Sequence, residues 1–391
     1  MNSPVLKLAS EPITGERIRR AKAAYTTRRV DLTQASRLRT EGVKPRSGDL
    51  VLARVEQIGQ HPRIELRDGR RARLHPGDEV VLCFGSRYAP DQFEAYVPEN
   101  LSACHMVAAG GIAGVSVNKH ERMKAATRLR PLGVLARDDG EVINLADFAL
   151  PETRVPANRP PVYAVVGASM NAGKTTCVGS IIAGFRKQGR TVGAAKITGT
   201  GAGGDRWVAV DAGADMFLDF TDAGAASTFG LEVADLVRIF ETLIGSLARQ
   251  GAEVIVLEIA DGIVQTETAA LIRSPAFARH CDGVVFAATD ALGASGAVAR
   301  LRDLNLDVRA VSGLLTASPL ATREAQQLVD APIVCTKNLS DLAWLATEGA
   351  ADRAPATDNR ADSVTAGDWL AVIGIKTDSG GRGYPAAASA D

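Results

Sequence analysis

The sequence has few cysteines, no excess of either charge and no apolar run long enough to cross a bilayer. Its five cysteines are scattered, without a Cys-x-x-Cys pair or a zinc-like spacing, and an odd count fits a reducing compartment better than a disulfide framework. The longest uncharged apolar stretch, residues 106–117, is short and rich in glycine. The amino terminus lacks the apolar core of a secretion signal. We therefore expect a cytoplasmic protein that does not bind membranes.

The chain is electrically neutral, with 45 basic and 45 acidic side chains among 391 residues. A neutral chain is not built for broad polyanion binding, so nucleic acid is not an expected partner. Residues 1–46 are nevertheless basic, and we expect them to form a solvated arm or, alternatively, to touch an acidic partner. The length allows two or three domains, and the sequence leaves a homo-oligomer possible.

Residues 47–150 are predicted to form a small β-rich domain, a barrel or a sandwich, because short β-type runs alternate there with turn signals. The expected strands are 50–55, 63–66, 71–74, 79–84 and 93–97. The glycine-rich stretch 108–114 is expected to be a hinge, a close-packed turn or a ligand-facing loop, and a short helix is expected over 119–129. Four prolines in residues 151–161 predict an extended linker and the main domain boundary.

Residues 162–350 alternate apolar strands with amphipathic helices, which is typical of a mainly parallel sheet covered on both faces. The fold class is therefore α/β. The expected strands are 162–166, 191–196, 253–258, 283–288, 308–313 and 332–336. The expected helices are 174–188, 234–249, 266–278, 294–304 and 319–329. Residues 351–391 are expected to be an extension and tail with one further strand candidate, 369–375.

A P-loop, the backbone cradle that binds nucleotide phosphates, is the most specific feature of the sequence. An apolar run from residue 162 leads into Gly167, and the spacing Ala168-x-x-x-x-Gly173-Lys174-Thr175 opens a helix. Lys174 is expected to reach the β and γ phosphates, and the Thr175 hydroxyl to bind Mg²⁺. The predicted nucleotide-binding residues here are Gly167, Asn171, Ala172, Gly173, Lys174, Thr175 and Thr176.

Two further segments are expected beside the P-loop. Glu258 ends an apolar strand and Asp261 follows it, so either can bind Mg²⁺ directly or through water, with Glu258 favoured. The glycine-rich segment 196–207 follows another strand, and its Lys196 and Asp205 are predicted to join Lys174 as catalytic groups that position a substrate. A flexible surface loop is the alternative for this segment.

The stretch Gly167-Ala-Ser-Met-Asn-Ala-Gly-Lys-Thr-Thr176 resembles the P-loop of dethiobiotin synthetase and its relatives, a class that includes the molybdopterin-guanine dinucleotide biosynthesis protein B. The resemblance covers roughly residues 162–340. It implies a mononucleotide-binding sheet, Mg-ATP and activation of a small acceptor. The chain departs from the dethiobiotin pattern at Ser169, where those enzymes carry an acidic residue, and at residues 259–262. The N-terminal β domain has no counterpart there.

These features predict an ATP- and Mg²⁺-dependent kinase or ligase that acts on a small-molecule substrate. The alternative is a nucleotide-driven switch or delivery protein, using GTP or ATP, whose β domain binds a macromolecular partner. The segment 335–341 is similar to a guanine-binding element, but its carboxylate is displaced by two residues, so ATP is expected. Lys337 is predicted to lie beneath the base with its aliphatic stem.

Overall fold

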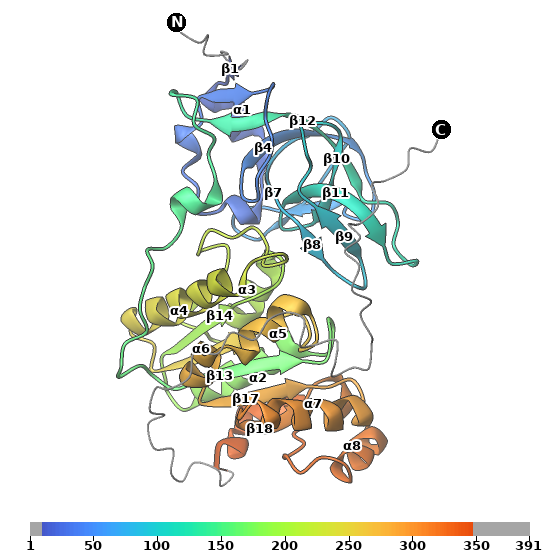
Figure 1. The fold of residues 1–391 in the computed structure, drawn as a ribbon, viewed down its shortest axis with the longest axis vertical. Helices are drawn as coiled ribbons and strands as arrows, with labels where there is room; N and C mark the ends of the chain where they lie inside the picture. Colours follow the sequence, from blue (N-terminus) through green and yellow to red (C-terminus); the bar gives the residue numbers. More distant parts are fainter. Residues whose placement is uncertain (1–9, 347–391) are drawn as a thin grey trace, which may run out of the picture. The chain divides into compact units, whose positions relative to one another are not determined.

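The computed structural model describes residues 10–346, which belong to one compact unit of the chain. Figure 1 follows the chain from a first portion rich in strands, residues 10–148, into a second portion with a parallel sheet, residues 162–346. We call these the β part and the α/β part. The predicted extension at 351–391 and its strand candidate at 369–375 lie outside the described residues.

The β part is built from strands that pair mainly antiparallel. The pairings run from β12 through β4, β7, β11 and β10 back to β12, so five strands form a closed ring. Its strands are β1 (Ser10–Pro12), β2 (Lys22–Ala23), β3 (Arg37–Arg39), β4 (Leu50–Gln57), β5 (Arg63–Glu65), β6 (Arg71–Arg73), β7 (Glu79–Phe84), β8 (Arg87–Tyr88), β9 (Phe93–Tyr96), β10 (Cys104–Ala108), β11 (Ile112–Lys119) and β12 (Thr127–Ala136). Its helical turns are α1 (Gly15–Arg20), η1 (Tyr25–Thr27), η2 (Leu32–Gln34) and η3 (Leu145–Phe148).

Two expectations for this portion are wrong. No helix forms over 119–129, because β11 extends to Lys119 and β12 begins at Thr127. In the glycine-rich stretch, residues 109–111 form a close-packed turn between β10 and β11, which is one of the expected alternatives. Gly114 suits β11 because a Cβ there would lie 2.9 Å from the Gly85 carbonyl. The described part of the basic N-terminal region, residues 10–46, is not a solvated arm: β1 pairs with β3, β3 with β12, and β2 with β7.

The α/β part has a six-stranded, fully parallel sheet of strand order β15-β14-β16-β13-β17-β18. The strands are β13 (Val162–Gly167), β14 (Val192–Lys196), β15 (Met216–Asp219), β16 (Val254–Glu258), β17 (Gly283–Ala287) and β18 (Val308–Ser312). The helices are α2 (Lys174–Lys187), α3 (Gly203–Asp211), α4 (Val233–Arg249), α5 (Thr266–Arg273), α6 (Pro275–His280), α7 (Ala291–Asp303) and α8 (Pro319–Gln326), with turns η4 (Leu314–Ala317), η5 (Thr336–Asp341) and η6 (Ala343–Ala346).

The two faces of this sheet carry separate hydrophobic clusters, as side-chain alternation along a strand requires. In β13, Val162, Ala164 and Val166 pack in the cluster that includes α4 to α7. Val165 packs on the opposite face with residues of α2 and α3. Apolar side chains on both faces explain why these strands read as continuous hydrophobic runs. The predicted parallel α/β sheet covered on both faces is confirmed.

Some element predictions in this portion need correction. Residues 332–336 form no strand, and only Ile333 makes a bridge, to Val311. The expected helix 266–278 is two helices, because Ser274 is extended and caps α6, whose first residue is Pro275. Neither α3 nor β15 was predicted.

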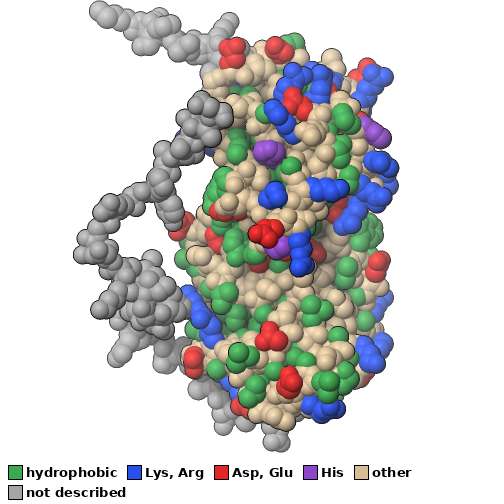
Figure 2. Space-filling model, turned by 90° about the vertical axis from the view of Figure 1, so that its right-hand side faces the viewer, with side chains coloured by type: hydrophobic (Ala, Val, Ile, Leu, Met, Phe, Trp, Pro, Cys, Tyr) green, Lys and Arg blue, Asp and Glu red, His purple; other side chains and the backbone are tan. Residues whose placement is uncertain are grey.

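The described surface agrees with the balanced composition. The face drawn in Figure 2 carries Lys and Arg side chains interspersed with Asp and Glu, so neither sign of charge covers it. Within residues 10–346, no helix has the length and apolar character needed to cross a membrane.

Candidate functional site

The P-loop connects β13 to α2 at the carboxyl edge of the parallel sheet. Gly173 precedes α2 with a positive φ of 97°, and Asn171 has a φ of 62°. Gly167 is required at the strand end because a Cβ there would lie 2.8 Å from the Lys174 Cγ. Lys174 is buried, and its Nζ donates a hydrogen bond of 2.8 Å to the Ser169 carbonyl oxygen. The loop backbone therefore encloses the ammonium group.

The remaining P-loop residues differ in exposure. Ala172 is buried, and its carbonyl accepts a hydrogen bond of 3.1 Å from the Leu314 N–H. Thr175 is half-buried and close enough to Glu258 to favour its charged form, whereas Thr176 is exposed. A carboxylate on a neighbouring strand is thus within reach of the first turn of α2.

A second group of side chains surrounds Lys196 at the ends of β14 and β16. Lys196 and Glu258 are register partners in the sheet, and the Lys196 Nζ lies 3.8 Å from a Glu258 carboxylate oxygen. Asp205, from the first turn of α3, lies 2.5 Å from the same Nζ. All three side chains are largely buried. The structure therefore brings together three of the residues that the sequence placed at the site.

Burial and charge set the protonation of this group. Burial lowers the pKa of Lys174 and raises the pKa values of Glu258 and Asp261. Burial opposes the charge of Lys196 as well, but the carboxylates of Asp205 and Glu258 outweigh it and raise the pKa of Lys196. Two cations and three acids thus face one another at the carboxyl edge, where ligands of open parallel sheets bind.

The β part contacts this edge through the segment after β14. The Gly203 N–H, at the start of α3, donates to the Glu65 carboxylate over 2.8 Å. The Trp207 indole Nε1 donates to the Asp68 carbonyl over 2.9 Å. Gly110 and Gly201 approach so closely that a Cβ on Gly110 would lie 1.9 Å from the Gly201 carbonyl oxygen. The predicted substrate loop is therefore partly a helix, and it is fastened to the β part.

A buried ion cluster makes a second connection between the two parts. The Arg28 guanidinium lies 3.0 Å from Asp219 and 2.5 Å from Asp222, and it also donates to the Thr221 hydroxyl. The Tyr25 hydroxyl donates to Asp219 over 2.8 Å. Although burial opposes ionisation, Arg28 and these hydroxyl groups hold the pKa of Asp219 below its usual range. Ion pairs and hydrogen bonds thus connect the end of β15 to residues near the amino terminus.

Of the remaining site residues from the sequence, Asp261 belongs to this group and Lys337 does not. Asp261 follows β16, and the adjacent Gly262 lies so close to the P-loop that a Cβ would be 2.4 Å from the Ala168 carbonyl oxygen. Lys337 is exposed in η5. Sequence reasoning missed Arg28, Asp219 and the β-part contacts. No local pattern indicates them, because their partners lie far away along the chain.

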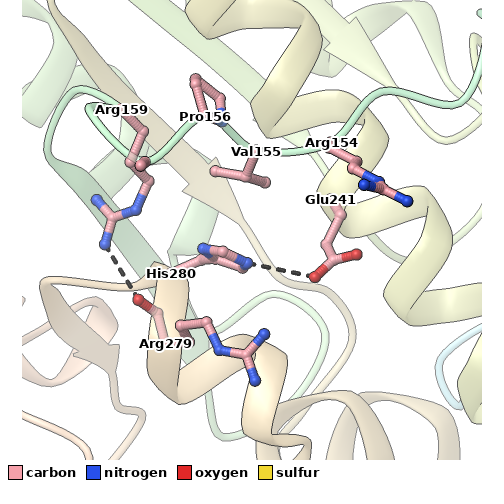
Figure 3. Close-up of a pocket in the computed structure, with 8 residues that line it drawn as sticks. Arg154, Val155, Pro156, Arg159, Glu241, Arg279 and His280 are labelled. Carbon is pink, nitrogen blue, oxygen red and sulfur yellow. Dashed lines mark hydrogen bonds and ion pairs between the residues drawn. The ribbon is translucent and has the colours of Figure 1, made fainter. Parts of the chain in front are cut away.

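A separate cavity of about 700 Å³ lies at the opposite edge of the sheet, next to the amino ends of β13 and β17. Figure 3 shows His280 directed toward Glu241, at 3.3 Å, and Arg159 toward the backbone carbonyl of Arg279, at 3.2 Å. Arg159 also pairs with Asp282. These polar groups largely satisfy one another. The cavity is remote from the P-loop edge, which we take as the functional site.

Comparisons with known proteins give only distant structural matches. No family model matches the sequence, and no curated protein matches it. The signal recognition particle receptor FtsY from Elizabethkingia anophelis is 18% identical, covering 44% of this chain and 59% of that structure, with a TM-score of 0.29. The 54 kDa signal recognition particle protein from Aeropyrum pernix, in complex with GDP, is 21% identical over 48% and 44%, with a TM-score of 0.33. Chloroplast FtsY from Physcomitrella patens is 18% identical over 48% and 62%, with a TM-score of 0.30. This chain thus spans less than two thirds of each.

The comparisons and the contacts described above bear on several expectations. The kinase or ligase prediction and the small-molecule substrate have no counterpart among the matched structures, which are a signal recognition particle protein and its receptors. The predicted substrate segment is also not an open loop, as its contacts with the β part show. ATP finds no support in these comparisons: the nucleotide named with one matched structure is GDP. The α/β part is a P-loop NTPase fold, but the finer resemblance to dethiobiotin synthetase is not supported.

Proposed function

We propose that this protein is a nucleotide-driven switch that binds a nucleoside triphosphate with Mg²⁺ and acts on a macromolecular partner. In this proposal the nucleotide occupies the P-loop, and the segment from Lys196 to Asp211 transmits its state to the β part. The closed ring of strands would then form the small barrel of a separate domain, bounded at residues 151–161.

One observation carries the proposal: helix α3 is connected both to the P-loop edge and to the β part. Its Asp205 pairs with Lys196, which contacts Glu258 beside the P-loop. The same helix bonds to the β part through Gly203 and Trp207. A group that responds to the γ-phosphate can therefore move a helix that the β part holds, as order and position changes do in nucleotide switches.

The residues present fit a magnesium nucleotide. The Lys174 ammonium is held by a single loop carbonyl, which phosphate oxygens can replace. The Thr175 hydroxyl and the Glu258 carboxylate are hard oxygen donors, which Mg²⁺ prefers. Mg²⁺ bound there would neutralise phosphate charge. Gly167, Asn171, Ala172, Gly173 and Thr176 would supply the phosphate cradle, with Asp261 as a second acid and Lys337 beside the base.

The two acids should not contribute equally. We expect Glu258→Gln to reduce nucleotide turnover about 100-fold while affinity changes little, because metal-bound charge helps most as the phosphate bond breaks. Asp261→Asn should have a smaller effect, since Glu258 is the acid that contacts Lys196 and whose charge Thr175 favours. Phosphate release at saturating Mg²⁺, measured for both variants, tests the ranking. A larger loss in Asp261→Asn would reverse it.

The switch itself is tested through Trp207, whose indole bonds to the β part. We expect its fluorescence to differ between a bound non-hydrolysable triphosphate analogue and the diphosphate. Asp205→Asn should abolish this difference while leaving affinity within about threefold, because it weakens the Lys196 connection without touching the P-loop. Parallel titrations with GTP and ATP identify the base.

The control for this experiment is Trp207→Phe, which removes the reporter and should eliminate the nucleotide-dependent signal. Identical spectra of the wild type in the two nucleotide states would contradict the proposed switch. Failure of the wild type to bind either GTP or ATP would contradict it as well.

A further inference from the structure

The hairpin of β8 and β9 in the β part reaches the P-loop. Asp91, in the turn between these strands, accepts a hydrogen bond of 2.6 Å from the Asn171 side-chain amide. Asn171 lies in the loop itself, two residues before Gly173. The turn is held in place from within, because the Gln92 N–H donates to the Ala89 carbonyl over 2.8 Å. A segment about 80 positions earlier in the sequence therefore contacts the phosphate-binding loop.

Arg87 opens this hairpin and is a buried cation. Its residue surface is only 6% exposed. One terminal nitrogen donates to the Gln92 side-chain oxygen over 3.0 Å, and the other donates to the Val107 carbonyl. Within residues 10–346 the buried Nε of Arg87 has no hydrogen-bond partner, and neither has the buried Oδ1 of Asp91. Unpaired buried polar atoms are unusual and call for an explanation.

The carboxylates that act on Arg87 include one from the P-loop contact, Asp91, and one from the segment after β16, Asp261. Burial lowers the pKa of Arg87 to about 10, which keeps the guanidinium charged at neutral pH, and the carboxylates of Asp91 and Asp261 favour that charge. Asp261 belongs to the segment against the P-loop: the Ile263 N–H donates to the Gly167 carbonyl over 2.9 Å. The hairpin and the acidic segment after β16 thus meet at the same loop.

The charge balance at the carboxyl edge of the sheet suggests what Arg87 contributes there. Four acids gather there, namely Asp91, Asp205, Glu258 and Asp261, against the two lysines Lys174 and Lys196. Triphosphate would add further negative charge. A third fixed cation reduces the repulsion, and an arginine with an unused donor is suited to phosphate oxygens.

We propose that the β8–β9 hairpin belongs to the nucleotide site, with Arg87 supplying a positive charge to the phosphates within the same chain and Asp91 positioning the P-loop through Asn171. The inference rests on the proposed nucleotide binding. Hydrolysis transfers the γ-phosphoryl group to water, which yields nucleoside diphosphate and inorganic phosphate. The guanidinium stabilises the charge on the transferred group and is itself unchanged.

The test compares steady-state hydrolysis by the full chain and its variants, using whichever of GTP and ATP binds the wild type. Arg87→Ala should lower kcat about 100-fold or more with KM within about threefold, in line with other arginines supplied to phosphoryl groups. Free guanidinium ion should restore part of the lost kcat, and Arg87→Lys should retain more activity than Arg87→Ala. A purely structural arginine would give no such rescue.

Two further variants keep the test decisive. Arg54→Met is the matched control, because Arg54 also belongs to the β part but pairs with Glu79. The kcat of this variant should equal that of the wild type. If Arg87→Ala does not fold, Asp91→Asn decides, since it weakens the Asn171 contact without removing the buried cation. It should lower kcat severalfold.

Unchanged kcat in folded Arg87→Ala, or in Asp91→Asn, would overturn the inference while the nucleotide switch stands. A wild-type protein that binds no nucleotide would instead overturn the proposed function. The two failures are therefore distinguishable.

Discussion

Lys174→Ala should lower nucleotide turnover by roughly 100-fold or more and weaken triphosphate binding strongly, while the fold persists. The reason is geometric: the Lys174 ammonium is buried within the loop backbone, and its hydrogen bond goes to the Ser169 carbonyl rather than to a carboxylate. Within residues 10–346, its removal therefore breaks a hydrogen bond to a carbonyl and no ion pair. Calorimetric titration with GTP and ATP, together with phosphate release, measures the loss.

Lys187→Ala is the control for this prediction. Lys187 ends the same helix, α2, and is exposed, with a weak contact of 3.5 Å to the Ser340 hydroxyl. Its replacement should leave binding and turnover within about twofold of the wild type, because isolated surface charges contribute little. Equal binding by Lys174→Ala and the wild type would refute the assignment of residues 167–176 as the phosphate site.

Arg28→Met should destabilise the protein by about 3–5 kcal/mol, because it leaves the buried Asp219 carboxylate without its cation and Asp222 with only the contact to Arg29. The side chains are almost fully shielded: Arg28 is 9% exposed and Asp219 2%. Urea unfolding monitored by circular dichroism gives the free energy of unfolding. The expected change is a lower midpoint or, if the two parts then unfold separately, two transitions in place of one.

Acid should act on the same cluster. The pKa of Asp219 is held below its usual range, so its stabilising contribution is present at neutral pH and disappears as the pH falls through that lowered pKa. The exposed pair Arg238–Asp235 provides the comparison. Arg238→Met should cost less than about 1 kcal/mol. A similarly small cost for Arg28→Met would show that the cluster does not hold the two parts together.

The parallel sheet and the P-loop could be predicted because each depends on neighbours in the sequence. The apolar run of β13, the glycine turn and the start of α2 are contiguous. The meeting of Lys196 and Glu258 also follows from simple topology, since the carboxyl ends of parallel strands share one edge. For these residues, the local sequence pattern and the geometry of a parallel sheet are sufficient to predict where they lie.

The errors arose where long-range packing overrides local preference. Helix α3 begins within a glycine-rich segment of low helix propensity, yet Glu65 accepts the hydrogen bond of its first N–H and Trp207 anchors it to Asp68. In the β part, β11 passes through Gly114, where the carbonyl oxygens of Gly85 and Tyr96 leave no room for a side chain. A window of neighbouring residues contains none of these partners.

The sequence by itself determined the phosphate-binding loop, the alternating strands and helices, and the acid at the end of β16, because these depend on spacing along one short stretch. Only the tertiary structure decided what faces that loop. The contacts Asn171–Asp91, Gly203–Glu65 and Arg28–Asp219 join residues 80 to 191 positions apart. These contacts are stabilised by burial and by charge pairing between the β part and the α/β part. Both effects require the two parts to be packed together, so they arise only in the folded chain.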